Sequence, residues 1–484
     1  MNRRLVLLMS LVLAVMSLPW AAGDDLQAGI EAFNKNDVTA AIIALQKATA
    51  EAPENAAAWL WLGTALLRQG DAAAAVEPLT KATALQPANL DAWLNLGLAH
   101  MKKGDAAQAE QAYLKAGEID PKSAEVKYNL GNAYLSQNKV LSAVAAYREA
   151  VALDGKHAGA YHNLAVALQR KGENVETLTH YRKAAQLAPD NAMFQYHLGL
   201  ITRSSGEIEE SLKCFEAALK LDPSLPQLHL NYGLSLYAKG RFQQAADALK
   251  EAAKREPGDF LTHYNLGLTL VRLNKRDEAI KAYRAALAVR AADAPTLNNL
   301  ACIYLDMNKV DEAVPLLEKA VQSSKRYPLA NQNLAMAYGR KGDEKRAMEQ
   351  WQTVVKMDPA SARAREALGG WHLGAGRLPE AEKEYLTVVR LEPKNVAALN
   401  NLGLVYEKMA KFDKALEYLR AALKIKPDYA LAHNNMGIVY ERIGKPDQAV
   451  EAYKKALAIQ PNYGDAKANL ERLRSQASQP TATG

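Results

Sequence analysis

The sequence predicts an all-α protein built from tandem pairs of short helices, and three regularities lead to this fold class. In residues 396–429, apolar side chains recur at the i, i+3, i+4, i+7 spacing of one helix face, first from Leu399 to Tyr406 and again around Leu419. Pro427 then ends the second helix, because proline lacks the amide proton that a continuing helix requires. Proline recurs in phase with Pro427 at multiples of 34 residues, and glycine or asparagine recurs with the same period between the two helices of each pair.

The 34-residue period runs through most of the chain without insertion or deletion. The other prolines in phase are Pro53, Pro87, Pro121, Pro189, Pro223, Pro257, Pro359, Pro393 and Pro461. The sequence therefore predicts thirteen units over residues 24–463, the first of which overlaps an N-terminal leader. Their expected boundaries are 22–55, 56–89, 90–123, 124–157, 158–191, 192–225, 226–259, 260–293, 294–327, 328–361, 362–395, 396–429 and 430–463.

The repeat unit resembles the tetratricopeptide repeat. The residues that carry the resemblance are Leu399, Leu402, Gly403, Tyr406, Ala415, Leu419, Ala422 and Pro427, with leucine in place of the family's Trp and Phe. This resemblance implies a right-handed superhelical α-solenoid, in which each repeat packs only on its neighbours. It also implies that the exposed side of the first helices lines a concave groove.

Two small-residue positions per unit support the predicted helix pairs. The position between the two helices is glycine or asparagine in every repeat except one, where it is Ala410. Glycine and asparagine tolerate the left-handed conformation that closes a helix. The other residues at this position are Asn36, Gly70, Gly104, Asn138, Gly172, Gly206, Gly240, Asn274, Asn308, Gly342, Gly376 and Gly444. The second position, represented by Gly403, is expected to let the paired helices approach closely.

The two ends of the chain differ from the repeats. Arg3 and Arg4 precede an apolar run that ends before Pro19, and small residues follow, so residues 1–23 are predicted to be a cleaved signal peptide. We therefore expect an exported protein, periplasmic or secreted, with an uncleaved N-terminal anchor as the alternative. No later segment is apolar enough to span a membrane. Residues 464–476 are expected to form a capping helix and 477–484 a disordered tail.

The sequence carries no motif for catalysis, and we expect neither enzyme activity, nor a cofactor, nor a metal. Nucleotide-binding loops, zinc-binding H-E-x-x-H and nucleophile elbows are absent from it. His229 and His263 share one repeat position, where core packing is the favoured interpretation over metal binding. Cys214 and Cys302 lie on helices too far apart for a disulfide and are expected to be small buried apolar residues.

One position on the exposed side of the first helices is asparagine in nine of thirteen units, although asparagine is a mediocre helix former. This asparagine row consists of Asn95, Asn129, Asn163, Asn231, Asn265, Asn299, Asn333, Asn401 and Asn435. Two interpretations remain open. The side chains either hydrogen-bond between adjacent first helices or face water, or they bind the backbone of an extended peptide, since an amide both donates and accepts. The second interpretation is similar to the asparagine-lined groove in the repeat region of O-linked N-acetylglucosamine transferases, and the similarity covers the groove alone, without a catalytic domain.

A basic row runs beside the asparagine row, and an acidic ligand bound there should bind more weakly as salt rises. It consists of Arg68, Lys102, Arg170, Arg272, Arg340, Lys408 and Arg442. The residues that form two-residue carboxylate clamps in chaperone-binding relatives are absent, so an EEVD-type tail is not expected. Nucleic acid is not expected either, because 60 basic residues are nearly balanced by 53 acidic ones and no dense basic run occurs.

These observations predict a non-catalytic protein-interaction scaffold in the cell envelope that binds an extended peptide segment of a partner in its groove. The main alternative is a substrate-recruiting or regulatory subunit of an enzyme system, for example a glycosyltransferase, whose catalytic chain is separate. A structural part of a secretion, pilus or envelope assembly is the third possibility.

Overall fold

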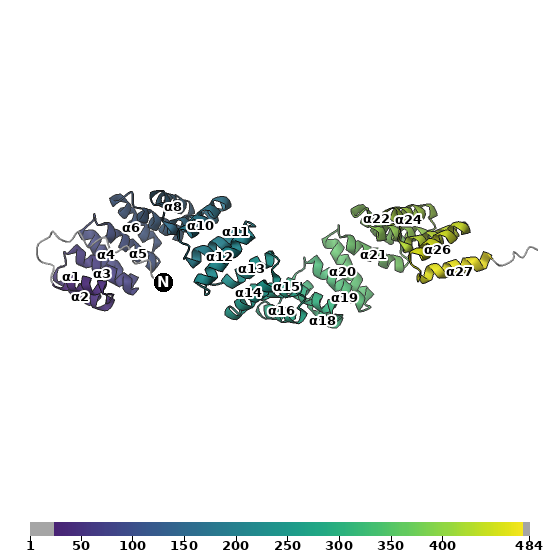
Figure 1. Ribbon diagram of the computed structural model, residues 1–484, viewed down its shortest axis with the longest axis horizontal. Coiled ribbons are helices and arrows are strands. Elements are labelled where there is room, and N and C mark those ends of the chain that lie inside the picture. Colours follow the sequence, from purple (N-terminus) through teal and green to yellow (C-terminus); the bar gives the residue numbers. More distant parts are fainter. Residues whose placement is uncertain (1–23, 478–484) are drawn as a thin grey trace, which may run out of the picture. The chain divides into compact units, whose positions relative to one another are not determined.

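The protein is all-α, as predicted. The computed structural model describes residues 24–477, and within this range the chain forms 27 α-helices, an order of thirteen successive pairs followed by one last helix (Figure 1). On either side of Arg241, the helices of a pair are antiparallel and each pair packs on the next. The predicted signal peptide (1–23) and all but the first residue of the predicted tail lie outside the described residues. The helices group into two compact units that divide between Arg241 and Phe242.

Unit 1 contains six complete helix pairs and the first helix of a seventh. Each first helix is followed by its second helix after a turn of two or three residues. The helices are α1 (Asp24–Asn34), α2 (Val38–Glu51), α3 (Ala56–Gln69), α4 (Ala72–Leu85), α5 (Leu90–Lys103), α6 (Ala106–Ile119), α7 (Ala124–Ser136), α8 (Val140–Leu153), α9 (Ala158–Lys171), α10 (Asn174–Leu187), α11 (Ala192–Ser204), α12 (Ile208–Leu221) and α13 (Leu228–Ala238).

Unit 2 begins with a second helix, continues through six pairs and ends with a helix that has no successor in the described chain. That last helix is one residue longer than the predicted cap. The helices are α14 (Phe242–Arg255), α15 (Phe260–Arg272), α16 (Arg276–Val289), α17 (Ala294–Asp306), α18 (Val310–Ser323), α19 (Pro328–Arg340), α20 (Glu344–Met357), α21 (Ala362–Gly374), α22 (Leu378–Leu391), α23 (Val396–Lys408), α24 (Phe412–Ile425), α25 (Ala430–Arg442), α26 (Pro446–Ile459) and α27 (Gly464–Ala477).

Polar residues two positions after the in-phase prolines start most of the first helices. Asn55, for example, accepts hydrogen bonds from the backbone amides of Ala57 and Ala58 at 3.0 and 3.3 Å. Such side chains satisfy amide donors that the first turn of a helix leaves unpaired. Asn89 and Asn395 act in the same way.

The turn between paired helices is left-handed in every unit, which confirms the predicted position. All thirteen residues there have positive φ, including Ala410, whose φ is 57°. A side chain with a Cβ is strained in this conformation, so the helical fold overrides the local preference of Ala410.

The second small position confirms the close approach of paired helices. A Cβ added to Gly403 would lie 2.6 Å from Cγ of Leu419 on the partner helix, and one added to Gly97 would lie 2.4 Å from the ring of Tyr113. Large side chains of the second helices therefore fill the space above these glycines and form much of the buried core.

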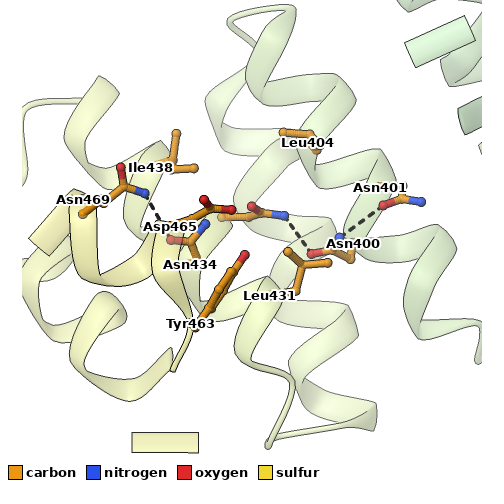
Figure 2. Close-up of a pocket in the computed structure, with 11 residues that line it drawn as sticks. Asn400, Asn401, Leu404, Leu431, Asn434, Ile438, Tyr463, Asp465 and Asn469 are labelled. Atoms are coloured by element: carbon orange, nitrogen blue, oxygen red, sulfur yellow. Dashed lines mark hydrogen bonds between the residues drawn. The ribbon is translucent and has the colours of Figure 1, made fainter. Parts of the chain in front are cut away.

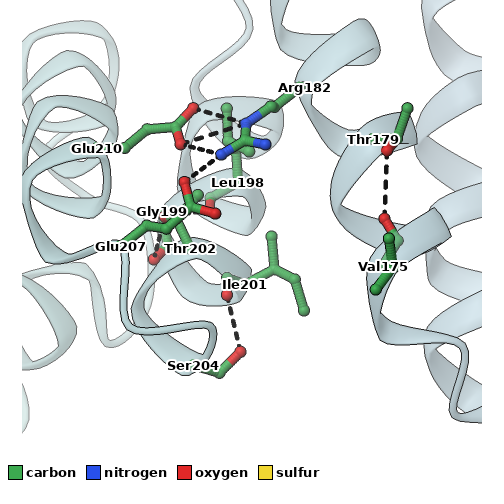
Figure 3. Close-up of polar contacts among 10 residues, drawn as sticks. All are labelled: Val175, Thr179, Arg182, Leu198, Gly199, Ile201, Thr202, Ser204, Glu207 and Glu210. Atoms are coloured by element: carbon green, nitrogen blue, oxygen red, sulfur yellow. Dashed lines mark hydrogen bonds and ion pairs between the residues drawn. The ribbon is translucent and has the colours of Figure 1, made fainter.

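Ion pairs also join successive second helices at a fixed spacing of 28 residues. Arg182 on α10 binds Glu210 on α12, with Nε 3.0 Å from Oε1, and it also contacts Glu207 (Figure 3). Arg148 and Glu176 make the same contact one repeat earlier, with 2.9 Å between Arg148 Nη2 and Glu176 Oε1. These pairs are exposed, so each contributes little to stability.

Two expectations about single residues are wrong. His263 is not a core residue, because it is half-buried and its Nε2 lies 2.8 Å from the carbonyl oxygen of Pro257, where it fastens the preceding loop. Cys302 is half-buried and its Sγ accepts a hydrogen bond from Asn333, whereas Cys214 is buried as expected. Burial raises the pKa of the Cys214 thiol to about 12. None of the helices between residues 24 and 477 is long and apolar enough to cross a membrane.

Candidate functional site

The asparagine row joins adjacent repeats through hydrogen bonds. Seven of its nine side chains donate from Nδ2 to an acceptor in the preceding repeat, usually on the preceding first helix. The bonds are Asn95 to Thr64 Oγ1 (3.0 Å), Asn163 to Asn132 Oδ1 (2.8 Å), Asn231 to Tyr196 OH (3.0 Å), Asn299 to Tyr264 OH (3.5 Å), Asn333 to Asn298 Oδ1 (2.8 Å), Asn401 to Tyr385 OH (3.1 Å) and Asn435 to Asn400 Oδ1 (3.0 Å).

The other two members of the row behave differently. Asn265 donates to the carbonyl oxygen of Leu261 in its own helix at 2.7 Å. Most other members of the row find their acceptor 31 or 35 residues earlier in the chain. At these spacings Asn129 meets Leu98 and Leu94, and a leucine side chain offers no acceptor. The bond between repeats therefore depends on which residue the preceding helix supplies.

The expectation that this side of the first helices has no packing role is wrong for three asparagines. Asn231, Asn333 and Asn435 are between 6 and 9% exposed. A buried amide requires partners, and these side chains find them on the neighbouring helix. The structure thus favours the interpretation that the row stabilises the stack, while peptide binding by the same residues stays a prediction.

The basic row also serves the contact between repeats. Arg68, Lys102 and Arg340 donate to backbone carbonyls 35 residues earlier, those of Phe33 (3.0 Å), Leu67 (3.5 Å) and Leu305 (2.7 Å). Each of these carbonyls belongs to the last turn of the preceding first helix, where a cation also compensates the helix dipole.

The remaining basic side chains fall into two groups. Arg442 pairs with Glu407 at 3.2 Å, and the guanidinium of Arg272 lies 4.3 Å from the centre of the Phe242 ring. Arg170 and Lys408 are exposed. Most of the predicted cations are thus already used within the protein, which weakens the case for an acidic ligand.

A hollow of about 420 Å³ opens on the exposed side of α23, α25 and α27, and it is the candidate site (Figure 2). Its floor consists of two separate sets of hydrogen-bonded amides. Asn435 donates to Asn400, Asn400 donates to Asn401 at 3.2 Å, and Asn469 donates to Asn434 at 3.2 Å. Asn400 and Asn434 are nearly fully buried, with 1 and 3% of their surface exposed. The floor is therefore a fixed polar surface.

The walls of the hollow are aliphatic, with a tyrosine and one carboxylate. Leu404, Leu431 and Ile438 supply the aliphatic surface, and Tyr463 and Asp465 line the hollow with them (Figure 2). Asp465 is the only charged residue among those that line it. Burial, together with the Asp465 charge, raises the pKa of Tyr463. Such a surface suits a segment that presents backbone polar groups and small apolar side chains.

The sequence predicted only part of this site. Asn401 and Asn435 belong to the asparagine row, and the structure brings both to the hollow. The buried neighbours Asn400 and Asn434 were missed, although the Asn-Asn doublets at 400–401 and 434–435 were a visible signal. Asp465 was missed because its repeat position is variable in the other units.

A pair of imidazoles occupies the same row in unit 1. His197 stands at the asparagine position of its repeat, and its Nδ1 lies 2.6 Å from Nε2 of His162 on the preceding first helix. The rings stack with centres 4.9 Å apart, and His162 Nδ1 lies 3.1 Å from Asn163 Oδ1. His197 therefore makes the contact between repeats that asparagine makes elsewhere. Across residues 24–477 there is no group of three or more side chains suited to holding a metal ion.

Comparison with known families finds repeats over most of the described chain. Family profiles described as tetratricopeptide repeat match residues 26–89, 66–133, 196–260, 333–396, 372–408 and 394–462, and a profile described as TPR repeat matches 131–172. The profile of the Psidin N-terminal TPR repeats region matches residues 236–362. Comparison with curated proteins gives no match.

Many solved structures are similar to the chain, and three are representative. The APC/C hetero-tetramer Cut9-Hcn1 is 18% identical, with 92% of this chain and 95% of that chain covered and a TM-score of 0.38. YrrB, described as a TPR protein with an unusual peptide-binding site, is 25% identical over 39% of this chain and 96% of its own, with a TM-score of 0.36. A tetratricopeptide repeat protein from Parabacteroides merdae is 19% identical over 52% and 100%, with a TM-score of 0.37.

Proposed function

Because this chain belongs to the tetratricopeptide repeat family, we propose that it is a protein-binding scaffold of the cell envelope whose first helices hold an extended segment of a partner protein. The observation that carries the proposal is the hollow over α23, α25 and α27. It combines a fixed amide floor with aliphatic walls.

The hydrogen bonds of the asparagine row define what the row offers to a ligand. Where Nδ2 donates to the preceding repeat, as in Asn95, Asn231, Asn333 and Asn435, the carbonyl Oδ1 is not used in that bond. These four residues therefore present acceptors held in fixed directions, which suit the backbone N–H groups of an extended segment. Adjacent helices lie about 8–10 Å apart and an extended chain advances about 3.3 Å per residue, so successive first helices meet the segment about every third residue.

Site-specific photocrosslinking tests the binding surface. A photoreactive residue at Leu404, which lines the hollow, should yield a covalent adduct with one partner protein, and excess unlabelled protein should suppress it. The matched position is Arg420, exposed on the second helix α24, which should yield no such adduct. Identical adducts at both positions, or none at Leu404, would contradict the proposal.

The envelope location depends on the sequence of residues 1–23. A short positive region, an apolar run and small residues before Asp24 support export. We expect the native protein to begin at Asp24 and to fractionate outside the cytoplasm. N-terminal sequencing that finds Met1 or Asn2 would overturn the export part of the proposal and leave the scaffold part intact.

A further inference from the structure

One repeat position on the exposed side of the first helices is acidic, or carries a large exposed apolar side chain, in six repeats and in α27. It is the second residue of the first helix, and we call these residues the first-turn row. They are Asp91, Glu125 and Met193 in unit 1, and Leu261, Leu329, Leu431 and Asp465 in unit 2. Arg363 is the one basic residue at this position among the described helices, and it donates to the sulfur of Met336.

The apolar members of the row are large hydrophobic side chains that are partly exposed. Between 37 and 48% of the surface of Met193, Leu261, Leu329 and Leu431 is open. Leu431 is one of the side chains that line the hollow, so its exposed apolar surface is available to a partner.

The acidic members lack a cation of their own. Among the described residues, no lysine or arginine forms an ion pair with Asp91, Glu125 or Asp465. Burial raises the pKa of Asp91, and burial together with the Asp91 charge raises the pKa of Glu125. A positive group placed beside these carboxylates would relieve both effects.

Resting on the proposed function, we infer that the partner segment is basic and aliphatic, and that the hollow over α23, α25 and α27 binds one aliphatic side chain of the segment together with one lysine or arginine. Leu431, Leu404 and Ile438 receive the aliphatic side chain, and Asp465 receives the cation. Asn434 supports this fit, because it is buried and its Nδ2 is not used in the bond from Asn469, so it can donate to a ligand carbonyl. Leu431 and Asp465 lie on successive first helices, so the two ligand side chains stand about three residues apart.

The net charge of the chain makes this inference easy to separate from general attraction. The sequence carries a formal net charge of +7, so long-range attraction alone favours acidic peptides. A preference for basic peptides must come from local carboxylates.

The test uses three labelled peptides, each with three copies of a four-residue unit: Leu-Ser-Ser-Lys, Leu-Ser-Ser-Ser or Leu-Ser-Ser-Glu. Fluorescence polarisation with the full chain at low salt should show the tightest binding for the lysine peptide and the weakest for the glutamate peptide. Asp465→Asn should weaken the lysine peptide about 2- to 5-fold and leave the serine peptide unchanged. The loss should shrink as salt rises.

Asp447→Asn is the matched control, because Asp447 lies in the first turn of the neighbouring second helix α26 and is exposed. This change removes the same charge and the same dipole interaction, and it should leave all three affinities as they are. Equal binding of the three peptides, tighter binding of the glutamate peptide, or equal effects of the two aspartate variants would overturn the inference. Crosslinking at Leu404 would still stand in those cases, so the proposed function can survive its failure. Absence of binding by all three peptides, with crosslinking at Leu404 intact, would also overturn the inference and not the scaffold.

Discussion

Acidification should weaken unit 1 through the paired imidazoles of His162 and His197. Their facing nitrogens lie 2.6 Å apart, so only one proton fits between them. Burial, with the charge of His162 acting in the same direction, lowers the pKa of His197 to about 4, and burial lowers the pKa of His162. The ring of Tyr181 packs against both histidines, and burial raises the pKa of its phenol to about 12, so it stays neutral.

The sign follows from the direction of these shifts. In the unfolded chain a histidine binds its proton near pH 6.5, whereas in the folded protein His197 binds it near pH 4. Between these values the unfolded state holds more protons, so the free energy of unfolding falls as the pH is lowered from about 6.5 to 4. The full shift of the His197 pKa corresponds to a loss of about 3.4 kcal/mol in the free energy of unfolding. The partial exposure of the ring to water reduces this loss to about 2 kcal/mol.

The variant His197→Asn isolates this effect, because asparagine is the residue that other repeats carry at this position and it can donate to His162. Thermal unfolding followed by circular dichroism at pH 7.0 and 4.5 measures it. On acidification the wild-type Tm for unit 1 should drop about 4–8 °C more than that of the variant.

His433→Gln is the control, since His433 lies in unit 2 and contacts the carbonyl oxygen of Pro427. It should keep the full acid sensitivity of unit 1. If His197→Asn and the wild type lose the same Tm between the two pH values, the imidazole pair does not control this sensitivity and the reasoning is refuted.

Three further predictions concern stability and the asparagine row. Ala410→Gly should raise the free energy of unfolding by about 0.5–1 kcal/mol, because it relieves a left-handed alanine, and Gly444→Ala should lower it by a similar amount; denaturant unfolding that leaves both unchanged would contradict this. Gly403→Leu should cost about 3 kcal/mol, since the new side chain collides with the partner helix, and an unchanged melting curve would show that the pairing is misassigned. Changing Asn231, Asn265, Asn299 and Asn333 together to alanine removes three hydrogen bonds between repeats and should lower the free energy of unfolding by about 1.5–4.5 kcal/mol. Binding of the crosslinked partner, measured at a temperature where this variant is folded, decides whether the row also contacts the ligand.

Local signals in the sequence were sufficient for the helices and their turns. Proline and the small residues act through the backbone of their own unit, so their period revealed helix ends and left-handed turns, even at Ala410. The partners of polar side chains were beyond this reasoning. Whether Asn401 hydrogen-bonds to a neighbouring helix, to a ligand or to water depends on how successive first helices are offset along their axes. The sequence of one repeat does not determine this offset. The hollow escaped prediction for the same reason, because it forms only where α23, α25 and α27 meet.

The bonds between first helices also give the stack a direction. The later repeat supplies the donor and the earlier repeat the acceptor, as in Asn333 to Asn298 and Arg340 to Leu305, and α27 continues the rule through Asn469. A chain synthesised from its N-terminus therefore offers each emerging repeat a folded predecessor whose acceptors are already in place. Loss of leading repeats would strand buried donors, which is costly, whereas loss of trailing repeats would leave only acceptors that water can reach. The protein should thus tolerate shortening far better from its C-terminal end than from its N-terminal end.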